Sequence, residues 1–139
     1  MLKKLPLLVF CFIAPLSASE DASEESEKLE VLQSSKQAIY ESTLECQTEL
    51  DTASFQECWL KVSHKGQAVK NTEIFIDGGM AGHNHGLPTS PKLVWSDDKN
   101  AYSIQGLRFS MSGNWQLSFK VNADEDAMKD EINMEIEVN

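Results

Sequence analysis

The residues whose side chains are best suited to chemistry lie in one glycine-rich stretch, GGMAGHNHGLPTSP, at residues 78–91. It holds Met80, His83 and His85. In an extended segment, side chains two residues apart point the same way, so His83 and His85 can present two imidazoles to one point. Thioether sulfur is a soft ligand and imidazole a borderline one, a pair that suits copper, above all Cu(I), better than calcium or magnesium. Zinc fits the histidines but gains little from a methionine.

Met111, at the end of a predicted strand beside a turn, is a candidate fourth ligand. No spacing in the sequence places it near the loop. A structural role is the alternative: the histidines can bond backbone carbonyls while Met80 and Leu87 close the end of a core. Metal binding and this structural role both remain open at the level of sequence.

The elements that must position the loop show an apolar–polar alternation with a period of two. Alternation of this kind predicts strands with one buried and one wet face. It runs through residues 44–50, 58–62, 72–77, 115–121 and 132–138, and residues 92–95 and 101–111 are further strand candidates. The parity flips at Gly106, where glycine permits a bulge or bend. About seven short strands joined by polar turns predict an all-β fold, an antiparallel sandwich of immunoglobulin-like type.

The N-terminal residues predict export. Lys3 and Lys4 precede an apolar run at 5–16 and small residues at 17–19, the layout of a signal peptide at 1–19. The run is too short for a membrane anchor, which needs about 20 apolar residues. After cleavage we therefore expect no stable membrane insertion.

The next segment, residues 20–40, is predicted to be an acidic linker and lead-in. It opens with EDASEESEK, and Leu29, Leu32 and Ile39 have some helical spacing, which predicts a short helix or a loose lead-in. The sandwich domain is then expected at 41–139.

Cysteine usage fits an oxidising compartment. Cys11 leaves with the signal, so Cys46 and Cys58 remain, both on the inward parity of the first two predicted strands. We expect a disulfide between them, with two reduced core thiols as the alternative. Their spacing is not C-x-x-C, which argues against a redox catalyst.

Charge and motifs exclude several functions. The 139 residues carry a formal net charge of −10, which disfavours nucleic acid and anionic lipid as partners. The chain has no G-x-S-x-G and no phosphate loop, and we expect a protein that is not an enzyme. Trp59 is predicted to lie on the polar, solvent-facing side of its strand, where an aromatic side chain can contact a partner.

The run from Trp59 to Val121 resembles the YtkA-like domains, exported or membrane-tethered bacterial modules related to the FixH type. The pieces that carry the resemblance are WLKV, G-x-x-V, IFIDGGMAGHNHGLPTSP and YSIQGLRFSMSGNWQLSFKV. The resemblance implies an immunoglobulin-like sandwich in the bacterial envelope, associated with copper traffic and the assembly of respiratory enzymes. Its loop positions are Met80, His83 and His85, with Met111 on the following turn.

These observations predict a periplasmic binding domain that binds or hands over copper. The alternative is a metal-free interaction module that docks on another envelope protein, as an accessory in respiratory enzyme assembly. It would do so through the loop end or the Trp59 face.

Overall fold

The computed structural model describes residues 27–139. The predicted signal peptide at 1–19 and the linker residues 20–26 lie outside that range. Within it, nine strands and one 3-10 turn follow along the chain. They are β1 (Leu29–Ser34), β2 (Glu41–Cys46), β3 (Cys58–His64), β4 (Gln67–Ala68), β5 (Glu73–Gly79), β6 (Lys92–Ser96), β7 (Ala101–Gln105), β8 (Gly113–Asn122), η1 (Asp126–Met128) and β9 (Asp130–Val138).

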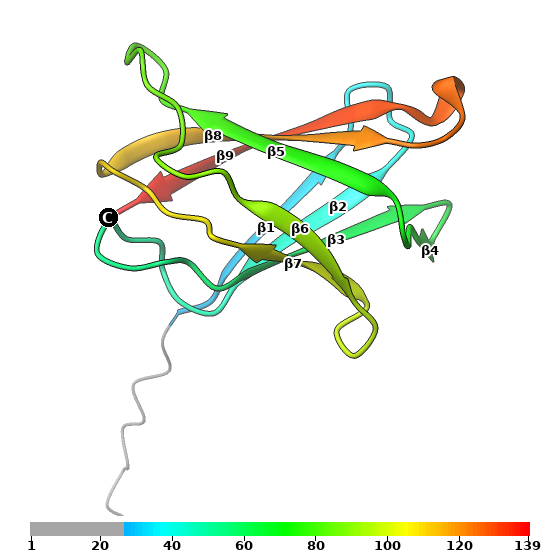
Figure 1. Ribbon diagram of the computed structural model, residues 1–139, viewed down its shortest axis with the longest axis horizontal. Coiled ribbons are helices and arrows are strands. Elements are labelled where there is room, and N and C mark those ends of the chain that lie inside the picture. Colours follow the sequence, from blue (N-terminus) through cyan, green and yellow to red (C-terminus); the bar gives the residue numbers. More distant parts are fainter. Residues whose placement is uncertain (1–26) are drawn as a thin grey trace, which may run out of the picture.

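The strands form two antiparallel sheets that face each other (Figure 1). The first sheet has the order β1-β2-β3-β7-β6, with β4 paired to β3, and the second has the order β5-β8-β9. At the seams between the sheets, β1 lies near β9 and β5 lies near β6. The predicted all-β antiparallel sandwich is confirmed.

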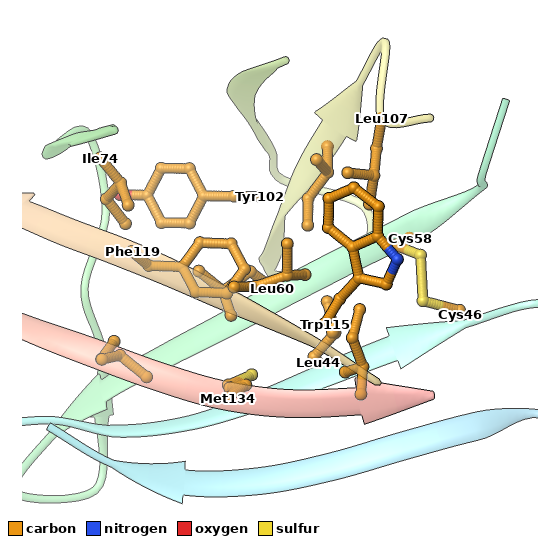
Figure 2. Packing of buried hydrophobic residues seen from close by; sticks show 14 of the residues in the cluster. Leu44, Cys46, Cys58, Leu60, Ile74, Tyr102, Leu107, Trp115, Phe119 and Met134 are labelled. Atoms are coloured by element: carbon orange, nitrogen blue, oxygen red, sulfur yellow. A yellow bond between two sulfur atoms is a disulfide. The ribbon is translucent and has the colours of Figure 1, made fainter. Parts of the chain in front are cut away.

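The core lies between the sheets and is built from alternate residues of the long strands. In β8, Trp115, Leu117 and Phe119 are at most 2% exposed, while the residues between them face away from the core. Leu44 and Leu60 of the first sheet meet them from the other side (Figure 2). Burying each such side chain stabilises the fold by about 1.5–3 kcal/mol. A one-residue slip would turn the whole row outward, so this burial also fixes the register.

Cys46 and Cys58 form a disulfide, as predicted. The two residues face each other directly in the β2–β3 register and are both buried. Figure 2 shows the bridge among the core side chains. The bond therefore ties neighbouring strands of one sheet and closes the connection between them.

The prediction of a short helix or loose lead-in before residue 41 is wrong, because Leu29–Ser34 is strand β1. Leu29 and Val31 alternate toward the core and pack against it, whereas Leu32 is 70% exposed on the outer side. A period of two, completed by pairing with β2, overrides the weak helical spacing. The first sheet thus begins before the predicted start of the domain.

Two predicted strands end earlier than the alternation suggests. β2 stops at Cys46 rather than at residue 50, and β7 stops at Gln105 rather than at residue 111. Gly106, with φ +80°, turns the chain out of the sheet. Leu107 and Phe109 remain fully buried beyond it. Irregular segments that cover the end of a core can bury alternate side chains, as strands do. The apolar–polar alternation therefore continues beyond the last residue that is hydrogen-bonded in the sheet.

The seam between β1 and β9 is held by a nearly buried carboxylate. Both oxygens of Asp130 accept the N–H of Gln37, at 3.0 and 3.1 Å. Burial alone would raise the pKa of Asp130, but hydrogen bonds from Ser35, Glu131, Gln37 and Ile39 outweigh it and hold that pKa below its usual value. The ionised carboxylate therefore stabilises this seam.

Three connections gather at the opposite end of the sandwich, near the C-terminus (Figure 1). The backbone N–H of Gln56 donates to the carbonyl of Leu107 at 2.8 Å. The hydroxyl of Thr89 donates to the carbonyl of Gly106 at 2.6 Å. These bonds tie together the connections at 47–57, 80–91 and 106–112, and Thr89 anchors the C-terminal part of the glycine-rich stretch.

Candidate functional site

The Met/His loop, defined here as residues 80–85, projects from the end of β5 (Figure 1). Gly79, the last residue of β5, forms an isolated antiparallel bridge with Gly86, so the loop closes as a hairpin. A Cβ on Gly78 would lie 2.8 Å from Leu117 Cδ2 and 3.2 Å from Leu87 Cγ. Only glycine leaves room there for Leu87 to pack beside the strand, and this packing fixes the root of the loop.

The first part of the loop is a tight turn. The N–H of His83 donates to the carbonyl of Met80 at 3.2 Å, and Gly82, the third residue of the turn, has φ +83°. A positive φ at this position is characteristic of a type II turn, which requires glycine or asparagine there. The turn reverses the chain so that His83 and His85 lie at the exposed tip.

The structure brings the two histidines together. Their ring centroids are 5.8 Å apart, the ring planes differ by 27°, and both side chains are exposed. A metal ion about 2 Å from an imidazole nitrogen is about 3 Å from the ring centroid, so two imidazoles on one ion have centroids about 5–6 Å apart. The observed separation falls in that range. The two rings are stacked as they stand, so one nitrogen of each would reach a shared ion only after the exposed rings rotate.

Met80 turns back from the tip toward the core. Its Cε lies 2.9 Å from the position that a Cβ on Gly113 would occupy. Gly113 has φ +122°, a backbone conformation that residues with a side chain rarely adopt. This glycine therefore allows the turn and also leaves the space in which the Met80 side chain packs. The thioether is half-buried against the core, at the base of the loop.

Met111 lies two residues before Gly113 on the same turn. Its side chain is 37% exposed, and its carbonyl accepts the indole N–H of Trp115 at 3.0 Å. The fold thus connects Met80 to the turn that carries Met111, a link that no sequence spacing reveals. The candidate residues divide into an exposed histidine pair and two methionines associated with one turn.

A groove beside Met80 was not predicted from the sequence. It is lined in part by Gln116, Glu135 and Glu137, which come from the outer faces of β8 and β9. Alternation puts these residues on wet faces, but only the β8–β9 register places them beside the loop. Their two carboxylates make the potential beside the methionine favourable to a cation.

The candidate ligands on the Met/His loop and on the Gly113 turn are imidazole and thioether groups. Within residues 27–139, no group of three or more histidine, cysteine, aspartate or glutamate side chains is arranged to hold a metal ion. That finding bears on sites of the zinc or calcium type, whose ligands come from those residue types. Two imidazoles with thioethers constitute a different, softer set.

Comparison with known families gives a match over residues 34–120, to the YtkA-like family. The chain belongs to this family. The YtkA-like region runs from the end of β1 into β8 and contains both the Met/His loop and the turn at Gly113, while β9 lies beyond it. The family resemblance inferred from the sequence motifs is confirmed. Searches of curated proteins and of solved structures found no significant match. Across residues 27–139, no helix is long and apolar enough to span a membrane.

Proposed function

We propose that this YtkA-like protein is an exported bacterial envelope domain that binds or hands over Cu(I) at the Met/His loop. The observation that carries the proposal is the histidine pair, whose centroid separation of 5.8 Å suits two imidazoles on one ion. The hairpin that presents the pair is closed at Gly79 and Gly86. A site at an exposed tip is accessible to a donor or an acceptor of the metal.

Each residue has its own role in the proposal. His83 and His85 supply the two nitrogen ligands. Met80 supplies a thioether at the base of the loop, and Met111, partly exposed on the neighbouring turn, supplies a second one when the loop moves toward it. Soft sulfur favours Cu(I) over the harder divalent ions. This is binding chemistry, and the proposal assigns the protein no catalytic step.

The proposed location is the periplasm. The Cys46–Cys58 disulfide fits an oxidising compartment, and the predicted signal peptide at 1–19 supplies the route. In such a compartment Cu(I) requires ligands that hold it against oxidation, and thioethers provide them.

A second candidate function is a metal-free interaction module that docks on another envelope protein. The packing of Met80 favours it, because this side chain is half-buried against the core and contacts the Gly113 turn. In this alternative the methionine closes the end of the sandwich, and the hairpin tip serves as a contact surface.

A Cu(I) competition titration separates the two functions. The protein competes with a chromogenic Cu(I) chelator under anaerobic conditions, beside His83→Ala/His85→Ala and Met80→Leu. Asn84→Ala, an exposed change between the two histidines, is the matched control. The proposal expects one-to-one binding by the parent and the control, loss of binding in the double histidine variant, and weaker binding with Met80→Leu. Equal binding by the parent and the double histidine variant, or no competition by the parent, rejects the copper site and favours the interaction module.

A further inference from the structure

Trp59 is a large aromatic side chain on the face of β3 that points away from the core. Its neighbours Cys58 and Leu60 are buried, while Trp59 itself is partly exposed. Its cross-strand partners on this outer face are Glu45 and Ser103. Because Trp59 is partly exposed on the outer face of the sheet, part of its ring is accessible to an outside group.

Three lysines from separate parts of the chain line the same hollow as this ring. Lys28 precedes β1, Lys61 follows Trp59 on β3, and Lys99 lies in the turn between β6 and β7 with its Nζ 5.4 Å from the indole centroid. Together with Trp59 they line a hollow of about 380 Å³, in which Glu45 is the one acidic lining residue among residues 27–139. Glu45 already forms an ion pair with Lys61. The hollow is therefore locally basic in a chain whose net charge is −10.

The floor of the hollow is cross-linked by the disulfide and is partly buried. Cys46, which also lines it, is covalently bonded to Cys58, the residue before Trp59. Ala101, another lining residue, has no exposed surface. A site that is already formed loses little conformational freedom on binding, which preserves affinity.

We propose that this hollow, the Trp59 site, binds a short acidic segment of a partner polypeptide. An apolar side chain of the segment would pack on the indole while its carboxylates contact Lys28, Lys61 and Lys99. Tryptophan anchors of this kind dominate the binding energy at interfaces, and charges around them steer encounter. The lysine pairings are exposed and weak, so they exchange readily for contacts with the segment.

Charge complementarity favours a polypeptide over an anionic membrane as the occupant. A short acidic segment covers only the hollow, where the lysines outnumber the carboxylate. A bilayer would also meet the rest of this sheet face, which includes the exposed Glu30 and Glu41, and the negative charge of the whole chain. The proposal does not depend on copper, because the Trp59 site and the Met/His loop belong to different sheets.

The test uses a fluorescein-labelled peptide, DELDELDE, and a charge-reversed peptide, KKLKKLKK, in fluorescence anisotropy at low salt. The acidic peptide is expected to bind, and binding should weaken as about 0.5 M salt shortens the screening length. Trp59→Ala should reduce its affinity about tenfold or more, as for an anchor tryptophan. Lys28→Glu and Lys99→Glu should each weaken binding and flatten its salt dependence. In ¹⁵N-labelled protein, the indole N–H signal of Trp59 should shift on titration.

Phe75→Ala and Lys120→Glu are the matched controls, because Phe75 is 53% exposed and both residues lie on the outer face of the other sheet. Near-ultraviolet circular dichroism and thermal melting verify that each variant is folded. Failure of the acidic peptide to bind, equal binding of the basic peptide, or equal loss with the control variants overturns the proposal. Trp59-dependent binding to phosphatidylglycerol vesicles without binding to the peptide would also overturn it, in favour of a lipid surface.

Discussion

Adding one methyl group at the root of the Met/His loop should destabilise the protein, and the same change one residue later should not. In Gly78→Ala the new Cβ would lie 2.8 Å from Leu117 Cδ2 and 3.2 Å from both Leu87 Cγ and the carbonyl oxygen of Gln116. In Gly79→Ala the nearest atom is the His85 carbonyl oxygen at 3.4 Å, an ordinary contact. The two glycines are adjacent in β5, and neither has a positive φ.

The magnitude follows from two opposing effects. Alanine restricts the unfolded chain and stabilises by about 0.4–1 kcal/mol where it fits. Overpacking costs about 1–3 kcal/mol. Gly79→Ala should therefore be neutral or slightly stabilising, and Gly78→Ala should be less stable than it by about 2 kcal/mol. For a domain of this size that difference corresponds to about 8 °C in melting temperature.

The assay is urea unfolding at constant protein concentration with the disulfide intact, followed by tryptophan fluorescence and circular dichroism. The difference in unfolding free energy between the two variants is the quantity to compare. If Gly78→Ala is as stable as Gly79→Ala, Leu87 does not pack beside Gly78 as described. The account of how the loop root is fixed would then fail.

Three further predictions concern the loop, the disulfide and the seam between the sheets. Ala81→Pro fits the second position of the type II turn and should raise the unfolding free energy by about 0.4–1 kcal/mol, whereas a fall in thermal melting would contradict this turn assignment. Cys46→Ala/Cys58→Ala should lose about 3 kcal/mol, since the bridge spans a sequence separation of 12, and unfolding the parent with and without reductant checks the value independently. Asp130→Asn should lose about 1–2 kcal/mol at neutral pH. Because the folded pKa of Asp130 lies below its unfolded value, its stabilisation is complete above about pH 4 and is lost as the pH falls through the folded pKa. Urea unfolding between pH 2 and 7 should show that the unfolding free energy falls less steeply toward low pH in Asp130→Asn than in the parent. An equally steep fall in both proteins would assign the acid sensitivity to other groups.

Much of the fold could be predicted from local pattern. A period of two in residues 115–121 and 132–138 identifies β8 and β9, and their inward residues are the buried ones. The alternation predicted a strand wrongly at Leu107 and Phe109, because these side chains are buried although their backbone is not paired in a sheet. It also failed at β1, where the exposed Leu32 interrupts the alternation of Leu29 and Val31, and pairing with β2 decides the conformation.

The candidate site was only partly predictable. H-x-H spacing and the surrounding glycines already point to a loop with two neighbouring imidazoles. Met80 packs against Gly113, and this contact links the loop to the turn that carries Met111. The two residues in contact are about thirty positions apart along the chain. Strand pairing brings these residues together, and the periodicity of a sequence does not predict which strands will pair.

The sequence by itself therefore determined the residue types at the loop tip, the inward and outward faces of most strands, and the family. These properties depend on short-range stereochemistry: alternate side chains of a strand point to opposite faces, and glycine readily adopts the positive φ of the turn at Gly82. The tertiary structure decided which distant groups meet. The register of β5, β8 and β9 sets Met80 against Gly113 and beside two glutamates, and the pairing of the other sheet gathers three lysines around Trp59. Packing and pairing are many-residue properties, because each contact is stable only when the rest of the core fixes the strands that carry it.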